Sequence, residues 1–263
     1  MSKPLLHMEN LNRYFGGLHA VAEVDLGVQE GTIKGIIGPN GAGKTTMFNL
    51  IAGNLPLSSG TITFEGRSIA GLKPFRIAEL GIFRTFQTIR LCSHMSVEEN
   101  IMLGRHVRTR SGFAAGIFRP PWTRREERDI RSRAGEIMKL VEIDDFAEEE
   151  ATNLAFGKQR AVEFARALAA EPKLLLLDEP ASGLNIHETE DLAKLIARIR
   201  DMGITILLVE HDMSLVMDIC DEVTVLNFGR KIAEGTPAEI QKNPEVIKVY
   251  LGEESVVGEP DRA

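Results

Sequence analysis

The stretch GPNGAGKTT, residues 38–46, follows the apolar run IKGII and fits the spacing G-x-x-x-x-G-K-[ST]. Glycines let a backbone wrap closely around phosphate groups with its N–H groups pointing inward. A helix that starts directly after such a loop presents its positive end to the same anion. An ordinary glycine-rich turn is the alternative, but the strand pattern before the loop and the helix pattern after it favour a phosphate site.

The same stretch supplies charge and metal-binding groups. Lys44 offers a positive charge to the β- and γ-phosphates of a nucleotide, and Thr45 offers a hydroxyl to Mg²⁺. We therefore predict a nucleotide-phosphate loop formed by Gly38, Pro39, Asn40, Gly41, Ala42, Gly43, Lys44, Thr45 and Thr46.

Two carboxylates follow a second apolar run, in KLLLLDEP (173–180). The carboxyl ends of buried strands are where α/β sheets place their ligands. We expect Asp178 to hold Mg²⁺ through water and Glu179 to accept a proton from an attacking water. An acidic strand-to-loop turn is the alternative, and it loses weight because the phosphate loop is present in the same chain.

VEHD (209–212) ends a third apolar run in the same manner, and His211 is predicted to lie near Glu179 and the γ-phosphate. A lone histidine is more often structural, so this prediction depends on the other two motifs. The remaining histidines have no such setting and are interpreted as surface or core residues.

The elements around the phosphate loop are predicted from periodicity. Alternating apolar residues over 23–28 indicate a half-buried strand, and 32–37 a buried one. We expect a helix over Lys44–Leu55, with Gly53 near its end, and two short strands around Glu65-Gly66.

The C-terminal part alternates strands and helices. Residues 174–177 and 204–209 are predicted as buried strands, with an amphipathic helix around 192–199 ending before Gly203. A hairpin around Phe228-Gly229, a helix capped by Thr236 to Glu239, a helix from Asn243 to Tyr250 and a frayed tail over 253–263 complete this part.

Strand patterns vanish over 89–160, where arginine, glutamate and helix formers dominate. Nine arginines fall between Arg105 and Arg133. A solvated helix face balanced by nearby acidic residues is the first interpretation. A contact surface for cytoplasmic loops of a membrane subunit and attraction to anionic lipid head groups are the other two.

Length and composition set limits on the function. The chain has 263 residues, 43% hydrophobic and 26% charged, which suits one large α/β domain with an inserted subdomain. A net charge of −7 argues against a dedicated nucleic-acid binder. Cys92 and Cys220 are interpreted as reduced thiols of a cytosolic protein. We expect no secretory signal and no membrane-spanning segment, so any membrane role must come through a partner.

The motifs together resemble the ATP-binding subunits of ABC transporters: GPNGAGKTT, TFQ, NLAFGKQR, LLLLDEP, SGLN and VEHD follow in order. RTFQTIRL, the long insert and the ending NPEVIKVYLG look most like the ATPases of branched-chain amino acid importers. The resemblance implies an α/β fold: a P-loop NTPase core with N-terminal antiparallel strands and an inserted α-helical subdomain. Its expected division is 1–88 and 161–235 for the core, 89–160 for the helical subdomain, and 236–263 for C-terminal short helices and tail.

The resemblance also implies roles outside the phosphate loop. Phe15 lies where an aromatic residue stacks on adenine, with Tyr14 as the fallback and an ordinary core aromatic as the alternative. Gln87 would contact Mg²⁺ and the attacking water and relay the nucleotide state to a membrane subunit. An uninvolved polar loop residue is the alternative for Gln87.

The family signature Leu-Ser-Gly-Gly-Gln corresponds here to Leu154, Ala155, Phe156, Gly157 and Lys158. In the family this stretch opens a helix that caps the γ-phosphate of ATP held by the other subunit. The missing serine hydroxyl removes one hydrogen bond to a charged group, about 1.5–3 kcal/mol. Either the site is weakened or Lys158 compensates, and we expect a working but modest ATPase. Asn185 replaces the aspartate usual in the family, which leaves hydrogen bonding but removes charge.

The implied cycle needs two subunits, because each nucleotide is covered by the 154–158 region of the partner. The expected partners are a second ATPase subunit, in a homodimer or a paralogous heterodimer, membrane permease subunits and, indirectly, a solute-binding protein. ATP and Mg²⁺ are the expected ligands, no nucleic acid is expected, and the expected location is the cytoplasmic face of the inner or plasma membrane. Two alternatives remain: the ATPase of another transporter, such as a lipopolysaccharide exporter, and a soluble ATP-gated clamp on nucleic acid or ribosomes.

Overall fold

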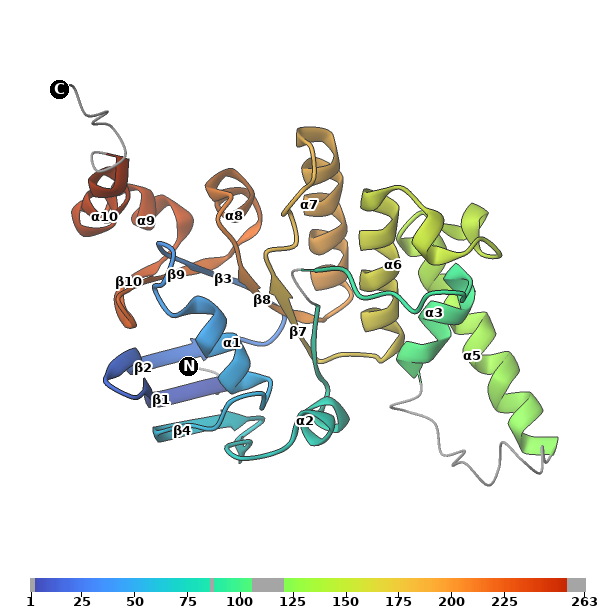
Figure 1. The fold of residues 1–263 in the computed structure, drawn as a ribbon, viewed down its shortest axis with the longest axis horizontal. Coiled ribbons are helices and arrows are strands. Elements are labelled where there is room, and N and C mark those ends of the chain that lie inside the picture. Colours follow the sequence, from blue (N-terminus) through green and yellow to red (C-terminus); the bar gives the residue numbers. More distant parts are fainter. Residues whose placement is uncertain (1–2, 86–87, 106–120, 255–263) are drawn as a thin grey trace. The chain divides into compact units, whose positions relative to one another are not determined.

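A computed structural model describes residues 3–85, 88–105 and 121–254 (Figure 1). The chain divides into two compact units. The first unit comprises Met1–Pro74 with Ile196–Ala263, and the second comprises Phe75–Leu195. Segments far apart in the sequence therefore build the first unit together.

An antiparallel sheet occupies the N-terminal part of the first unit, in the order β2-β1-β4-β5 (Figure 1). Its strands are β1 (Leu6–Phe15), β2 (Leu18–Val28), β4 (Ser59–Phe64) and β5 (Arg67–Ser68). The alternation predicted in β2 is confirmed, since Val24, Leu26 and Val28 are buried while Glu23 and Asp25 are exposed. The predicted pair of short strands around Glu65-Gly66 is also present, because both turn residues adopt positive φ angles.

Parallel strands form the other sheet region of the first unit. Strand β3 (Ile33–Ile37) pairs in parallel with β8 (Thr205–Val209) and with β9 (Glu222–Asn227). The hairpin from β9 to β10 (Arg230–Gly235) turns at Phe228-Gly229, as predicted. Every residue of β3 and β8 is buried, which fits their mainly apolar sequences, although β3 also buries Lys34.

A charge network around a buried lysine joins three of these strands. Lys34 of β3 is 2% exposed, and its Nζ donates to the Gly27 carbonyl at 2.8 Å and pairs with Glu222 at 2.7 Å. The same ammonium pairs with Glu234 of β10. Glu234 also accepts from Lys231 at 2.6 Å and from the Thr224 hydroxyl at 3.1 Å. The charge of a lysine inside the sheet is thereby balanced, as burial requires.

The helices of the first unit are short: α1 (Lys44–Ile51), α8 (Met213–Ile219), α9 (Pro237–Lys242) and α10 (Pro244–Glu254). The predicted helix over Lys44–Leu55 ends four residues early, at Ile51. Gly53 takes a φ of 71°, and the Asn54 and Leu55 amides turn back to the Asn49 carbonyl. The capping box of Thr236 and Glu239 is formed as predicted.

In the second unit, β6 (Ile82–Arg84) pairs in parallel with β7 (Leu174–Asp178). Helix α2 (Pro74–Leu80) precedes β6, and α7 (Ile186–Asp201) follows β7 and continues into the first unit. All of β7 is buried, as its leucine run predicts.

The rest of the second unit is helical. It contains α3 (Val97–Gly104), α5 (Pro121–Leu140), the short 3₁₀ turns η2 (Asp144–Phe146) and η3 (Ala151–Asn153), and α6 (Phe156–Ala169). Helices α3, α5 and α6 lie side by side (Figure 1). The approach of α3 to α6 requires Gly104, since a Cβ there would stand 1.9 Å from the Arg166 carbonyl oxygen. The expected α/β core with antiparallel strands and a helical insert is confirmed.

Part of the arginine-rich stretch lies within the described residues. Arg131 pairs with Glu98 at 3.2 Å, and Arg133 pairs with Glu136 at 2.5 Å. These pairs agree with a charge-balanced helix face for this part, while 106–120 lies outside the described residues. Among the helices that the structure describes, none is both long and apolar enough to cross a membrane.

Candidate functional site

The phosphate loop joins β3 to α1 in the first unit, and two of its glycines are required by close contacts. Gly38 has a φ of 149°, and a Cβ there would stand 2.1 Å from the Leu226 carbonyl oxygen. Gly43 has a φ of 102°, and its Cβ would stand 2.4 Å from the Ala20 carbonyl oxygen. By contrast, a Cβ on Gly41 meets no heavy atom within 4 Å. The loop is therefore held in its curve by the backbone of neighbouring strands.

Lys44 places its charge inside this loop. Its Nζ donates to the carbonyls of Gly38 at 2.6 Å and Pro39 at 2.9 Å, and the residue is 5% exposed. Gly43 caps α1 without a side-chain hydrogen bond, and Thr45 is exposed. A helix start with no side-chain cap, next to an ammonium group, is a site that favours an anion.

The turn between β9 and β10 supports the loop from outside. The Gly229 amide donates to the Ala42 carbonyl at 3.0 Å, and the Gly229 carbonyl accepts from the Ala22 amide at 2.8 Å. The turn thus ties the phosphate loop to β2. Sequence reasoning identified Phe228-Gly229 as a hairpin turn but not as a support of the loop, because no local pattern reports which distant segment a turn contacts.

Phe15 and Tyr14 lie at the end of β1 and are both exposed, by 41% and 47%. The Arg13 guanidinium lies 4.5 Å from the centre of the Phe15 ring, and Tyr14 stacks on His19 at 3.9 Å. The alternative of a buried core aromatic is therefore wrong for both residues. Each ring is partly covered, Phe15 by Arg13 and Tyr14 by His19, and each keeps exposed surface on which a base could stack.

Asp178 is the last residue of β7 in the second unit and Glu179 follows it directly, so both carboxylates lie at the carboxyl end of a buried strand, as the sequence predicts. Asp178 is 5% exposed, and its Oδ2 accepts from Nη2 of Arg84 on β6 at 2.5 Å. Glu179 takes a φ of 48°, and its carbonyl accepts from the Ser182 amide at 3.1 Å. A non-glycine residue with positive φ directly after a buried strand marks a backbone held in place by its surroundings. The motifs predict no contact between Arg84 and Asp178, although Arg84 is the first residue of RTFQ, because only strand pairing brings the two together.

His211 follows β8 in the first unit and is exposed. The preceding residue, Glu210, is 3% exposed and accepts from the amides of His211 at 2.7 Å and Asp212 at 3.2 Å. Asp212 caps α8 through the Ser214 and Leu215 amides. These bonds fix the backbone on both sides of His211.

Gln87 lies outside the described residues, so its predicted role stays a prediction.

The stretch 154–158 opens α6 in the second unit, as expected from its resemblance to the family signature. Ala155 is the N-cap residue and offers no side-chain hydrogen bond, while Leu154 is buried. A Cβ on Gly157 would stand 2.8 Å from Oε1 of Glu188 in α7. Phe156, 46% exposed, lies against Gly183. The helix start keeps its backbone amides but lacks the hydroxyl of the family signature.

The Lys158 ammonium is engaged within the second unit, which argues against Lys158 as the charge that compensates for the missing serine hydroxyl. Its Nζ donates to the Glu142 carbonyl at 2.8 Å and lies 5.7 Å from the centre of the Phe146 ring. Asn185 accepts from the Glu188 amide at 3.1 Å, and the Glu188 carboxylate accepts from the Asn185 amide at 2.9 Å. Asn185 is therefore a helix cap for α7, a task that needs hydrogen bonding and no charge.

Other chemistry finds little support in the described residues. Among them, no group of three or more His, Cys, Asp or Glu side chains could hold a metal ion.

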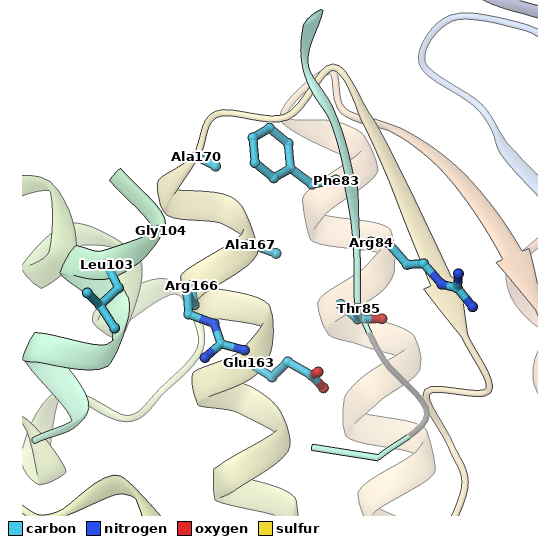
Figure 2. A pocket seen from close by; sticks show the side chains of 9 residues that line it. All are labelled: Phe83, Arg84, Thr85, Leu103, Gly104, Glu163, Arg166, Ala167 and Ala170. Carbon is cyan, nitrogen blue, oxygen red and sulfur yellow. The ribbon is translucent and has the colours of Figure 1, made fainter. Parts of the chain in front are cut away.

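Both cysteines are free, and burial raises the pKa of the Cys220 thiol to about 12, which makes it unreactive. A pocket of about 290 Å³ in the second unit is lined by residues of β6, α3 and α6 (Figure 2).

Comparisons with known proteins agree with the motifs. A sequence model of the ABC transporter family matches residues 21–182, and one described as a branched-chain amino acid ATP-binding cassette transporter matches 230–256. The high-affinity branched-chain amino acid transport ATP-binding protein BraF of Pseudomonas aeruginosa is 46% identical over 254 residues, covering 96% of this chain and 100% of BraF. LivG of Escherichia coli K12, also described as a high-affinity branched-chain amino acid transport ATP-binding protein, is 44% identical over 254 residues, covering 96% of this chain and 100% of LivG.

Solved structures give the same result. An ATP-binding cassette of an ABC transporter in its ADP conformation superposes with a TM-score of 0.83 at 31% identity, covering 95% of this chain and 100% of that one. A dimeric bacterial ABC transporter cassette superposes with a TM-score of 0.74 at 25% identity, covering 88% of this chain and 98% of that one.

Proposed function

Since the chain belongs to the ABC transporter family and is an ATP-hydrolysing cassette of it, we propose that it powers the uptake of branched-chain amino acids through membrane permease subunits. The full-length similarity to BraF carries this proposal, because it extends over 96% of the chain. The match of 230–256 to the branched-chain cassette model supports it independently of the nucleotide motifs.

The nucleotide's phosphates bind, in this proposal, to the loop from Gly38 to Thr46. The curved backbone and the α1 start supply amides, and Lys44 supplies charge. The ammonium leaves the Gly38 and Pro39 carbonyls for the phosphate oxygens when the nucleotide enters. Phe15 stacks on the adenine, for which its exposed ring at the end of β1 is suited.

Thr45, Asp178 and Gln87 hold Mg²⁺ in this proposal. The described groups fit the metal, since Mg²⁺ prefers oxygen ligands and Oδ1 of Asp178 accepts no hydrogen bond from the described residues. When bound, Mg²⁺ neutralises charge on the phosphate oxygens. Glu179 accepts the proton of the attacking water, and His211 orients the reacting groups.

A second subunit completes each site. Its stretch from Leu154 to Lys158 covers the γ-phosphate with the start of α6, where Ala155 leaves the backbone amides without a side-chain cap. The dimer, with itself or with a paralogue, moves permease subunits that receive solute from a binding protein. The assembly works at the cytoplasmic face of the membrane.

Reconstitution tests the proposal. The chain, its permease subunits and the cognate binding protein are placed in vesicles with ATP on the side of this chain, and uptake of leucine, isoleucine and valine is measured. We expect ATP-dependent uptake that Glu179→Gln abolishes. Uptake of another solute class, or ATP turnover with no transport of these amino acids, would refute the assigned substrate.

A further inference from the structure

An ion pair connects Asp178, in the motif LLLLDEP, to Arg84 on strand β6. Nη2 of Arg84 lies 2.5 Å from Oδ2 of Asp178, and the two side chains are 11% and 7% exposed. In Figure 2 the Arg84 side chain points away from α6, while Phe83 points toward it. Arg84 stands three positions before Gln87 in the sequence.

The backbone holds Arg84 in this position. Strands β6 and β7 are parallel, Arg84 is in register with Leu176, and the Thr85 amide donates to the Leu176 carbonyl at 3.0 Å. Arg84 is thus fixed one strand away and two residues before Asp178. A planar guanidinium held by a strand gives a carboxylate one defined orientation, which a flexible ammonium does not.

We propose that Arg84 is a positioning residue that orients Asp178 for Mg²⁺. Its hydrogen bond occupies Oδ2, and Oδ1, which accepts no hydrogen bond from the described residues, is left for the metal or its water. Arg84 also balances the buried Asp178 charge before the metal arrives. The inference rests on the proposed role of Asp178 and extends it, since no role for Arg84 follows from the motifs.

Two effects of Arg84 on Mg²⁺ have opposite signs. A fixed cation repels the metal, while a fixed carboxylate binds it better, because Mg²⁺ demands near-ideal octahedral geometry. Asp178 accepts the Arg84 hydrogen bond through Oδ2, which shields part of the Arg84 charge from the metal, so we take the orienting effect as the larger one. We therefore expect weaker metal binding when Arg84 is replaced.

The test measures metal binding without turnover. In a Glu179→Gln background with ATP present, Mn²⁺ is titrated and the free ion is followed by electron paramagnetic resonance. For Arg84→Gln we expect a Mn²⁺ dissociation constant raised about tenfold, as for other residues that orient a metal ligand. For Arg84→Lys we expect about threefold, because charge remains without the fork geometry. ATP affinity in EDTA should change less than about twofold.

Controls separate orientation from general damage. Arg76→Gln removes an exposed pair with Glu79 in the same unit and should leave Mn²⁺ binding unchanged. In the Asp178→Asn background, Arg84→Gln should cause no further loss, because the group that it orients is gone.

Several outcomes would overturn the inference while the proposed function stands. These are unchanged or tighter Mn²⁺ binding in Arg84→Gln, or additive losses with Asp178→Asn. If Arg84→Gln does not fold, as judged by circular dichroism, the Arg84→Lys measurement decides, and unchanged Mn²⁺ binding there counts against the inference. Failure of the otherwise unmodified chain to bind ATP would instead contradict the proposed function.

Discussion

The phosphate loop and the stretch 154–158 are both starts of helices suited to an anion, yet the chain builds them differently. Gly38 and Gly43 are fixed by backbone atoms of neighbouring strands, which cannot move aside. Gly157 faces the end of the flexible Glu188 side chain. A side chain at Gly38 or Gly43 would therefore force the loop itself to move. A side chain at Gly157 would instead require only the end of the Glu188 side chain to move, so the start of α6 should tolerate a small substitution better than the phosphate loop does.

Gly38→Ala gives the largest expected effect. A Cβ at 2.1 Å from the Leu226 oxygen cannot be accommodated without moving β9. We expect a loss of roughly 3 kcal/mol in the free energy of unfolding and of about a hundredfold in ATP affinity. Thermal unfolding and nucleotide titration measure the two quantities.

Gly41→Ala is the matched control in the same loop. Its φ is 79° and its Cβ meets open space, so it costs only backbone strain, about 1–2 kcal/mol. Equal effects of the two alanines on ATP affinity would show that strain alone, and not the contact with Leu226, fixes the loop.

Gly157→Ala should be much milder than Gly38→Ala. The Glu188 carboxylate can swing aside at the cost of its hydrogen bond from the Asn185 amide, so we expect a loss of about 1 kcal/mol in the free energy of unfolding. ATPase activity of the assembled transporter should fall about fivefold. Glu188→Ala in the same chain should restore part of that activity by opening space. A loss as large as that of Gly38→Ala would remove the contrast between the two regions.

Lys158→Gln should change ATP turnover less than about tenfold. Its ammonium is engaged with the Glu142 carbonyl and the Phe146 ring, so it supports the subdomain and not the reaction. The steady-state ATPase rate of the transporter tests this prediction, and Glu179→Gln serves as the reference for full loss of activity. A loss as deep as that of Glu179→Gln would mean that Lys158 acts on the phosphate.

The smallest effect concerns pH. Burial raises the pKa of Glu234, but hydrogen bonds from Lys231 and Lys34 and their charges outweigh burial and hold the pKa below its ordinary value of 4.5. A depressed folded pKa adds stability above the unfolded value, and that stability is lost as pH falls through the folded value. Unfolding free energy should therefore drop more steeply below about pH 4.5 in the unaltered chain than in Glu234→Gln. Parallel curves would exclude this contribution.

The sequence predicted those parts of the fold that depend on local patterns. The hairpin at Phe228-Gly229 and the capping box at Thr236 were correct because the turn residues themselves determine them. The bounds of strand β1 do not follow from the sequence. Register shifts from Met8 onward, between β1 and β2, interrupt the alternation of apolar and polar residues that marks a strand.

Contacts between distant segments could not be read in the same way. Arg84 and Asp178 are far apart in sequence, and only the pairing of β6 with β7 brings them together. The same holds for Glu188 beside Gly157 and for Gly229 beside Ala42. Motif spacing predicts the groups that would contact the ligand, while the residues proposed to orient those groups have no spacing of their own.

The central claim is that two copies of the cassette clasp ATP, each supplying what the other lacks. Glu179→Gln, assembled with its permease subunits and given ATP and Mg²⁺, is the most direct test, with bound nucleotide counted per complex and the state of the cassettes followed by cross-linking. The account predicts a stable closed pair with ATP retained in it. A complex that binds ATP but never closes, or closes equally well without nucleotide, would contradict the account.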